Sequence, residues 1–420
     1  MYKGPTSQSD LLFLYTNQIM KTLFNNYINT FRGLSREVWW LSLITLINRA
    51  GTMVIPFLTL YLTENLNFSL NDASWIMVPF GLGSVAGAWL GGKLTDKIGY
   101  YKVMVSSLLL TGIMFIYLQF LTTFASFCIG IFVVMVVADM FRPAMYVALS
   151  AYSKPENKTR SVTLIRLAIN LGFSAGPAIG GIIISTMSYT GLFWVDGITC
   201  LLATIVLLNV LNPKKSKILD VIKVKDPDSA YRDIPFIIFL GGMLLLALVF
   251  IQYFSTMPLY YKEVHELTMI DIGLLLGMNG FLIFVFEMPL IKWLENSRFT
   301  VSGLMLFGAI LLGLSFVVLN LTSWVGVLVI GMILMTVGEM IAFPFSNTFA
   351  MQRAKKGNQG EYMALYSIAF STAHIFGHTA GIQLIDEVGF DNTWHIISLV
   401  AALCVFLFFI LKQSLKTSKA

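Results

Sequence analysis

Long apolar runs separated by short polar segments occupy almost the whole chain. Each run is about 20 residues or longer, the length that an α-helix needs to cross the ~30 Å hydrocarbon core of a bilayer. The pattern therefore predicts an all-α membrane protein with twelve transmembrane helices. We place them at residues 38–62, 72–94, 101–122, 125–151, 161–186, 190–211, 235–260, 270–293, 299–319, 322–350, 361–385 and 393–412.

The segment between the sixth and seventh runs differs from the other connections. Residues 212–234 are charged and far longer than the other loops. They divide the chain into two bundles of six helices, at 38–211 and 235–413, and residues 414–420 form a tail. In the extension at 1–37, apolar residues recur at helical spacing, which predicts an amphipathic helix on the membrane surface. A poorly ordered extension is the alternative.

Basic residues gather on one side of the predicted membrane. Of the 28 Lys and Arg residues, 24 fall in the two terminal segments and in the loops on the same side as these ends. Three more lie within the runs, and only Lys262 lies on the other side. Because Lys- and Arg-rich loops stay in the cytoplasm, the N- and C-termini are predicted to be cytoplasmic. The expected location is the cell inner membrane.

The composition indicates lipid, rather than water, as the surroundings of the chain. Hydrophobic residues make up 57% and charged residues 12% of it, far from the averages of soluble domains. The net charge of +6 does not indicate a nucleic-acid partner, because the basic residues lie in short gaps between apolar runs. A Gly-rich stretch ending at Lys93 lacks the Ser or Thr of a P-loop and follows no strand. We therefore expect no cofactor, and an ion gradient or the substrate's own gradient as the energy source.

The loop after the second run carries a motif, GKLTDKIGYYK, at residues 92–102. It resembles the loop signature of the major facilitator superfamily, G-x-L-x-D-[RK]-x-G-x-x-[RK]. A tight turn needs a residue that is free to adopt positive φ, and an anion in this place would face a helix end or an arginine across the molecule. The resemblance implies that Asp96 helps to hold the cytoplasmic side shut. The expected gating residues are Gly92, Asp96, Lys97, Gly99 and Lys102.

The fifth run contains a second motif, GFSAGPAIGG, at residues 172–181. It resembles the G-x-x-x-G-P-x-x-G-G motif of the drug:proton antiporter branch of the superfamily. Small residues let helix backbones approach closely in lipid, and a proline can kink the helix. Helix packing alone is the alternative explanation. The motif residues are Gly172, Gly176, Pro177, Gly180 and Gly181.

Several ionisable side chains lie inside the predicted spans. A charge at the centre of a bilayer costs about 2.5–3.5 kcal/mol on the insertion scale, so such residues usually have a partner or a function. Burial also favours the uncharged form of a carboxyl group, which can then load and release a proton, as a histidine can. These residues are Arg49, Asp139, Arg142, Arg166, Glu287, Glu339, His374 and His378.

The resemblance to the superfamily implies roles for these side chains. Its helices 1, 4, 7 and 10 line a central cavity, so the expected substrate-cavity residues are Asn48, Arg49, Asp139 and Glu339. The candidate proton-coupling residues are Asp139, Arg142, Glu339, Glu287 and His374. A structural ion pair between Asp139 and Arg142 is the alternative for these two. The two histidines have no third ligand nearby, so no metal site is expected.

Arg49 has no acidic residue in its own span. A guanidinium stays charged at physiological pH, so it must find an anion or water. We expect the anion to come from Asp139, from Glu339 or from the substrate.

The two motifs imply a secondary transporter and not an enzyme. They favour antiport, in which protons are exchanged for a small amphipathic molecule that is exported by alternating access. The alternative is proton-coupled symport of peptides or other small anionic solutes, because Arg49 and Glu339 resemble the substrate-binding residues of proton-dependent oligopeptide transporters. The six-plus-six layout disfavours a channel. The expected partners are a small-molecule substrate, protons and the lipid bilayer, and the protein is expected to be a monomer.

Overall fold

The computed structural model is helical throughout the part of the chain that it describes. Within that part no β-strand is present, so the predicted all-helical fold is confirmed. Most of the predicted N-terminal extension and most of the charged linker lie outside it. The described residues are 25, 27–50, 53–54, 57–58, 61–211, 229–267, 269–322, 324–354 and 358–417.

The first half of the chain consists of long helices joined by short turns. Its short helices are η1 (Tyr61–Asn65) and η2 (Pro155–Asn157). Its α-helices are α2 (Arg36–Ala50), α4 (Leu70–Ile98), α5 (Tyr100–Leu118), α6 (Phe124–Asp139), α7 (Phe141–Tyr152), α8 (Lys158–Met187) and α9 (Tyr189–Val210).

The second half is built in the same way. Its short helices are η3 (Ala230–Arg232) and η4 (Val318–Asn320). Its α-helices are α11 (Ile234–Ser255), α12 (Met257–Glu263), α13 (Met269–Glu295), α14 (Val301–Val317), α15 (Gly326–Arg353) and α16 (Gln359–Thr417).

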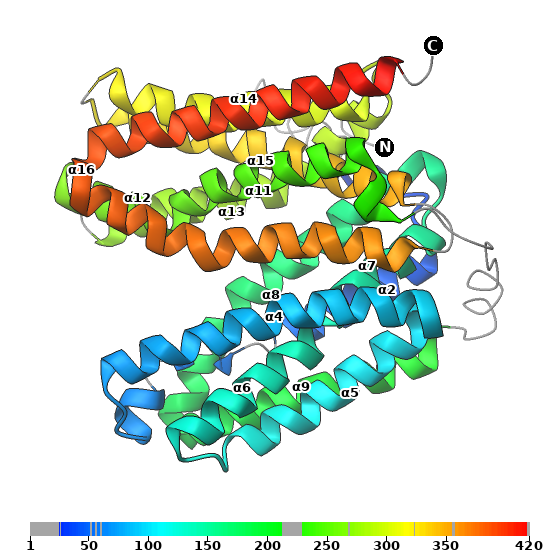
Figure 1. Ribbon diagram of the computed structural model, residues 1–420, viewed down its shortest axis with the longest axis vertical. Coiled ribbons are helices and arrows are strands. Elements are labelled where there is room, and N and C mark those ends of the chain that lie inside the picture. Colours follow the sequence, from blue (N-terminus) through cyan, green and yellow to red (C-terminus); the bar gives the residue numbers. More distant parts are fainter. Residues whose placement is uncertain are drawn as a thin grey trace, which may run out of the picture.

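Glycines with positive φ make two of the sharp turns between helices. Gly99 has φ 86° and separates α4 from α5, as its place in the loop motif predicts. Gly389 has φ 77° and is the non-helical residue inside α16. Glycine adopts such angles without the steric cost that a Cβ brings. The last two predicted spans therefore meet at Gly389, where Figure 1 shows α16 turning back on itself.

Nine helices in the described part of the chain are long and apolar enough to cross a membrane. Two predicted spans are not among the nine: the first, whose helix α2 has only 15 residues, and the fifth, on α8. The last two predicted spans are counted as one, because α16 joins them in one element. The number twelve and the cytoplasmic position of the termini stay predictions.

Three predicted spans are interrupted in the structure. The helix α2 ends at Ala50, and Met53 beyond it is non-helical. Met140 separates α6 from α7 inside the fourth predicted span, and Thr256 separates α11 from α12 inside the seventh. An apolar run predicts a membrane-spanning segment, but it carries no signal for a break within that segment.

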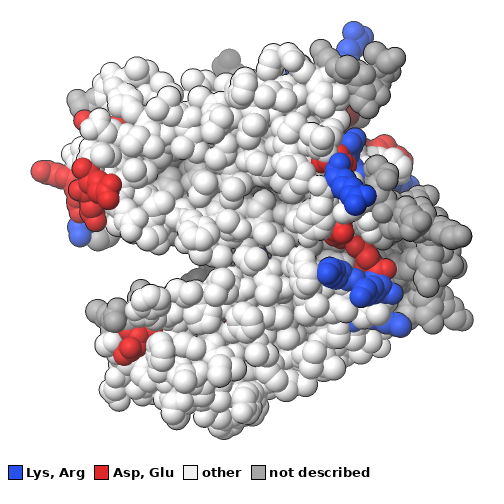
Figure 2. Space-filling model, viewed as in Figure 1, with Lys and Arg blue, Asp and Glu red and all other residues white. Residues whose placement is uncertain are grey.

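The two halves of the chain lie side by side as two bundles (Figure 1). The first bundle comprises α2 to α9 and the second comprises α11 to α16. Across their interface, α4 packs against α16, and α8 packs against α13 and α15. Figure 2 shows Lys and Arg side chains gathered at one end of the molecule, and a hollow between the bundles at the opposite end. We call these the basic end and the open end.

Candidate functional site

A buried ionic cluster joins the two bundles. Arg166 of α8 donates from Nε to Glu287 Oε1 at 2.9 Å, and from Nη2 to Glu339 Oε1 at 3.0 Å. Glu287 lies on α13 and Glu339 on α15, so both carboxyl groups belong to the second bundle. Glu287 is 0% exposed and Glu339 5% exposed. We call these three residues the Arg166 cluster.

The Arg166 cluster holds one guanidinium and two carboxyl groups. When both carboxyl groups are ionised its net charge is −1, and an uncompensated buried charge is costly. The second oxygen of Glu287, Oε2, is buried and has no hydrogen-bond partner among the described residues. One proton, or one additional cation, would neutralise the cluster.

Other side chains hold Glu339 and Arg166 in place. Asn279 Nδ2 donates to Glu339 Oε2 at 3.0 Å and to Thr336 Oγ1 at 3.1 Å. The Arg166 guanidinium lies 5.3 Å from the centre of the Phe343 ring, within the range of a cation–π contact. The orientation of the charged groups is therefore fixed by their surroundings.

A cavity of about 520 Å³ adjoins Glu339 at the seam between the bundles. Residues of α8, α11, α13 and α15 line it, so both bundles contribute to its wall. Asn279 and Glu339 are its buried polar residues. We call it the seam cavity.

The remaining wall of the seam cavity is mostly apolar. Leu171, Phe254 and Phe281 line it and are 51%, 44% and 64% exposed. A Cβ added at Gly277 or Gly280 of α13 would meet no atom within 4 Å. The space beside these glycines is therefore not filled by packing.

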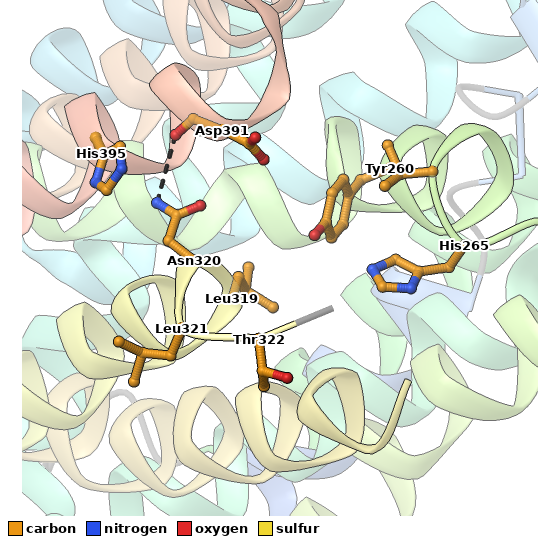
Figure 3. Close-up of a pocket in the computed structure, with 9 residues that line it drawn as sticks. Tyr260, His265, Leu319, Asn320, Leu321, Thr322, Asp391 and His395 are labelled. Atoms are coloured by element: carbon orange, nitrogen blue, oxygen red, sulfur yellow. Dashed lines mark hydrogen bonds between the residues drawn. The ribbon is translucent and has the colours of Figure 1, made fainter. Parts of the chain in front are cut away.

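A second cavity, of about 430 Å³, lies within the second bundle. Figure 3 shows Tyr260 and His265 on one side of it and Asn320 and His395 on the other. Asn320 Nδ2 donates to the backbone carbonyl of Asp391 at 3.4 Å. In the described part of the chain, no three His, Cys, Asp or Glu residues could together hold a metal ion. Because this cavity does not adjoin the Arg166 cluster, the seam cavity is the candidate site.

The structure brings three other predicted residues together inside the first bundle. Arg49 of α2 interacts electrostatically with Asp139 of α6 and Arg142 of α7. The Arg142 guanidinium lies 5.3 Å from the centre of the Phe370 ring of α16. Among the described ion pairs there is none between Asp139 and Arg142. Glu339, which was expected in the same cavity, is bound by Arg166 instead.

Two further predicted site residues are not in the Arg166 cluster. Asn48 Nδ2 donates to Cys200 Sγ of α9 at 3.6 Å, so Asn48 faces the interior of the first bundle. His374 is exposed on α16, and its ring centroid lies 4.8 Å from that of Phe370. The side chain of His378 lies outside the described residues.

Sequence reasoning missed Asp196 of α9. It is 0% exposed, and its carboxylate accepts hydrogen bonds from the backbone N–H of Met53 at 2.9 Å and of Val54 at 2.8 Å. These amides lie just beyond the end of α2. A signal was present, because Asp196 is an acid inside the sixth apolar run. Its partners are backbone groups, which no side-chain pattern marks.

The gating motif contacts the second bundle at the basic end. Asp96 Oδ1 accepts a hydrogen bond from Gly360 N–H at 2.7 Å, and Oδ2 accepts one from Glu361 N–H at 2.8 Å. These amides begin α16, so the predicted contact between an anion and a helix end is present. A Cβ at Gly92 would overlap the Gly360 carbonyl, so glycine lets α4 approach α16 closely. Lys97 and Lys102 are exposed.

The seam between α8 and α13 is also closed at the basic end. Arg160 Nε of α8 lies 2.7 Å from Glu295 Oε2 of α13. Beside this ion pair, Thr348 Oγ1 of α15 donates to Thr159 Oγ1 of α8 at 2.9 Å. Contacts between the bundles therefore close both seams at this end.

A segment before α2 crosses the same seam. Residues 27–35 contact α13, because Lys292 Nζ donates to Asn29 O at 2.9 Å and Tyr27 Oη donates to Phe284 O at 3.0 Å. They also contact α8, because Arg160 Nη1 donates to two of their carbonyl groups, at 3.1 and 3.2 Å. We call this segment the N-terminal strap.

Two glycines of the predicted antiporter motif lie at close helix contacts. A Cβ at Gly172 of α8 would lie 2.6 Å from Arg49 Cβ, and one at Gly180 would lie 2.8 Å from Phe57 Cε2. Gly176 is buried, whereas a Cβ added at Gly181 would meet no atom within 4 Å. The side chain of Pro177 lies outside the described residues. The motif therefore packs α8 against the first predicted span at two of its positions.

Comparisons with known proteins agree with the fold. A family model described as the Major Facilitator Superfamily matches residues 41–378. The uncharacterized MFS-type transporter YttB of Bacillus subtilis (strain 168) is 26% identical over 355 residues, covering 82% of this chain and 87% of that protein. A Na(+), Li(+), K(+)/H(+) antiporter of Planococcus maritimus is 21% identical over 395 residues, covering 86% and 92%. The crystal structure of a bacterial homologue of the iron transporter ferroportin, in an outward-facing state with soaked iron, aligns with a TM-score of 0.75. It is 16% identical and covers 90% of this chain and 100% of that one.

Proposed function

Because the chain belongs to the Major Facilitator Superfamily, whose members are multi-pass membrane transporters, we propose that it exchanges protons for a small amphipathic molecule. The observation that carries this proposal is the Arg166 cluster. It joins the two bundles, contains one more carboxyl group than guanidinium groups, and adjoins the seam cavity. The Planococcus relative, which is named as a cation/proton antiporter, supports exchange against protons.

In the proposed cycle, the two carboxyl groups carry either a proton or a substrate charge. We place the basic end in the cytoplasm by the positive-inside rule, so the hollow in Figure 2 opens outward. A proton that enters from outside would neutralise Glu287 or Glu339 and weaken the attraction of Arg166 across the interface. The bundles could then rock apart at the basic end, where substrate would enter and displace the proton.

A second candidate function is proton-coupled symport of peptides or other small anionic solutes. The observation that favours it lies in the first bundle, where the charges of Arg142 and Asp139 both act on Arg49. Two guanidinium groups and one carboxylate together carry a net positive charge, which would attract a substrate anion. Under this alternative, Arg49 binds the substrate directly.

The test is pH-driven efflux of a panel of cationic, neutral and zwitterionic fluorescent dyes from proteoliposomes. We expect Glu339→Gln and Glu287→Gln each to reduce gradient-driven efflux at least about tenfold and to leave dye exchange without a gradient largely intact, because the proton site is lost. Glu263→Gln is the matched control, since Glu263 is an exposed acid on α12. Full gradient-driven efflux by both cluster variants would refute the proposal. Uptake of a labelled dipeptide that is abolished by Arg49→Ala would establish the alternative instead.

A further inference from the structure

We infer that the seam cavity binds the apolar part of an amphipathic organic cation, whose charge takes the place of the Arg166 guanidinium at Glu339. This inference rests on the proposed transport function and adds the place and the charge of the substrate. It also assigns a role to Arg166, whose guanidinium competes with the substrate cation for Glu339. The central cavity that the sequence predicted, around Asn48 and Arg49, is not the place that this inference assigns.

The charge of the ligand follows from the acids at the cavity. Glu339 is the ionisable residue in the wall of the seam cavity, and the Arg166 cluster has an excess of one carboxyl group. Oε2 of Glu287 is buried without a hydrogen-bond partner in the described part of the chain. A buried carboxylate repels an anion, whereas a cation compensates its charge. An anionic ligand is therefore disfavoured at this place.

The shape and chemistry of the ligand follow from the rest of the wall. Four phenylalanines line the cavity, and its volume of about 520 Å³ suits a drug-sized molecule. Aromatic rings bury apolar surface and attract cations through their faces. The unfilled space beside Gly277 and Gly280 widens the cavity along α13. The four rings belong to Phe250, Phe254, Phe281 and Phe284.

The part played by Arg166 follows from its two ion pairs. Its guanidinium occupies the oxygens Oε1 of both Glu287 and Glu339. A ligand cation can form a strong ion pair with Glu339 only when Arg166 no longer binds this carboxylate. Arg166 should therefore weaken the binding of the ligand, which is the opposite of what a substrate-binding arginine does.

The first experiment measures equilibrium binding of tetraphenylphosphonium, a permanent lipophilic cation, to the purified full-length protein. Tetraphenylborate, of similar shape and opposite charge, is the comparison ligand. We expect the cation to bind and the anion to bind at least about tenfold more weakly, because of the carboxylates. Equal binding of the two ions would overturn the inference.

The second experiment tests the competition by Arg166. The double variant Arg166→Met/Glu287→Gln removes one positive and one negative charge and leaves Glu339 in place. We expect it to bind tetraphenylphosphonium about tenfold more tightly, because the built-in competitor is gone. The control Arg232→Met/Glu263→Gln removes the same two kinds of charge at exposed residues outside the cavity, and it should bind like the unsubstituted protein. Weaker binding by a correctly folded double variant, judged by its melting temperature, would overturn the inference.

The third experiment fills the cavity. Gly277→Leu and Gly280→Leu add side chains where a Cβ meets open space, so the fold should be retained while tetraphenylphosphonium affinity falls about tenfold. Leu274→Phe is the matched control on the same helix, since Leu274 is 67% exposed and does not line the cavity. Unchanged affinity in both glycine variants would overturn the inference.

The experiments distinguish an error in the cation-binding inference from an error in the proposed proton-coupled antiport. If proton-driven efflux is found for neutral dyes while tetraphenylphosphonium does not bind, the inference is wrong and proton-coupled antiport stands. If tetraphenylphosphonium binds as expected but no dye is moved by a pH gradient, the binding site stands and the proposed coupling to protons is wrong.

Discussion

Single buried carboxylates perform two different tasks in this molecule. Glu287 and Glu339 face a guanidinium across the bundle interface, whereas Asp196 faces backbone amides within the first bundle. In lipid, freed backbone N–H groups need a partner inside the protein. Asp196 therefore makes it possible for the first predicted span to be interrupted at Met53.

We predict that Asp196→Asn lowers stability. An asparagine offers one acceptor oxygen, and its amide group would face the N–H groups of Met53 and Val54, so at least one hydrogen bond to a charged acceptor is lost. Such bonds contribute about 1.5–3 kcal/mol, and we expect the melting temperature in detergent to fall by several degrees. Asp386→Asn, at an exposed acid on α16, is the control. An unchanged melting temperature would show that Asp196 does not stabilise the break.

At the scale of residues, the sequence indicates which side chains need partners but not which partners they find. Arg166, Glu287 and Glu339 are all recognisable as charges in apolar runs. The paired residues are 121 and 173 positions apart along the chain. A single sequence does not indicate which of its helices pack against one another. The sequence left Asp139, Glu339 and the substrate as possible partners of Arg49, and in the structure Glu339 binds Arg166 while Asp139 acts electrostatically on Arg49.

Helices are the scale at which the sequence is most informative. Apolar runs of membrane-spanning length predict where helices lie, and Gly99 predicts the turn between α4 and α5. The breaks at Met140 and Thr256 were not predicted, because the runs remain apolar through them. The contact of Asp96 with the first amides of α16 was anticipated, since an anion there compensates the positive end of a helix dipole.

We predict that Asp96→Asn opens the basic end more often. The amide replaces one of two acceptor oxygens at the start of α16 and removes the negative charge, and helix N-caps of this kind contribute about 1 kcal/mol. A severalfold shift between two balanced states should follow. The readout is the labelling rate of cysteines introduced at the basic end, which should rise. Lys154→Gln, at an exposed residue outside the gating motif, should not change it, and equal rates in both variants would exclude a latch at Asp96.

At the scale of the whole molecule, both seams are closed at the basic end while the opposite end is hollow (Figure 2). A transporter that works by alternating access must break these contacts in every cycle. The hydroxyl oxygens of Thr159 and Thr348 lie 2.9 Å apart. A cross-link between these two positions would keep the bundles together at the basic end.

We predict that the pair Thr159→Cys/Thr348→Cys, in a background without the three native cysteines, forms a disulfide under oxidation. Cross-linked protein should lose transport, because the bundles can no longer separate at the basic end, and a reducing agent should restore it. Each single cysteine variant is a control that should transport under both conditions. Full transport by the oxidised pair would mean that this end does not open.

The N-terminal strap has a consequence for how the protein is made. Its residues leave the ribosome before any of the predicted spans, yet Tyr27 and Asn29 contact residues that follow them by 257 and 263 positions. These hydrogen bonds can form only after most of the second bundle has been synthesised and inserted. Docking of the strap is therefore a late event in biogenesis, and a chain that stops after the first bundle has no α13 to which the strap can bind.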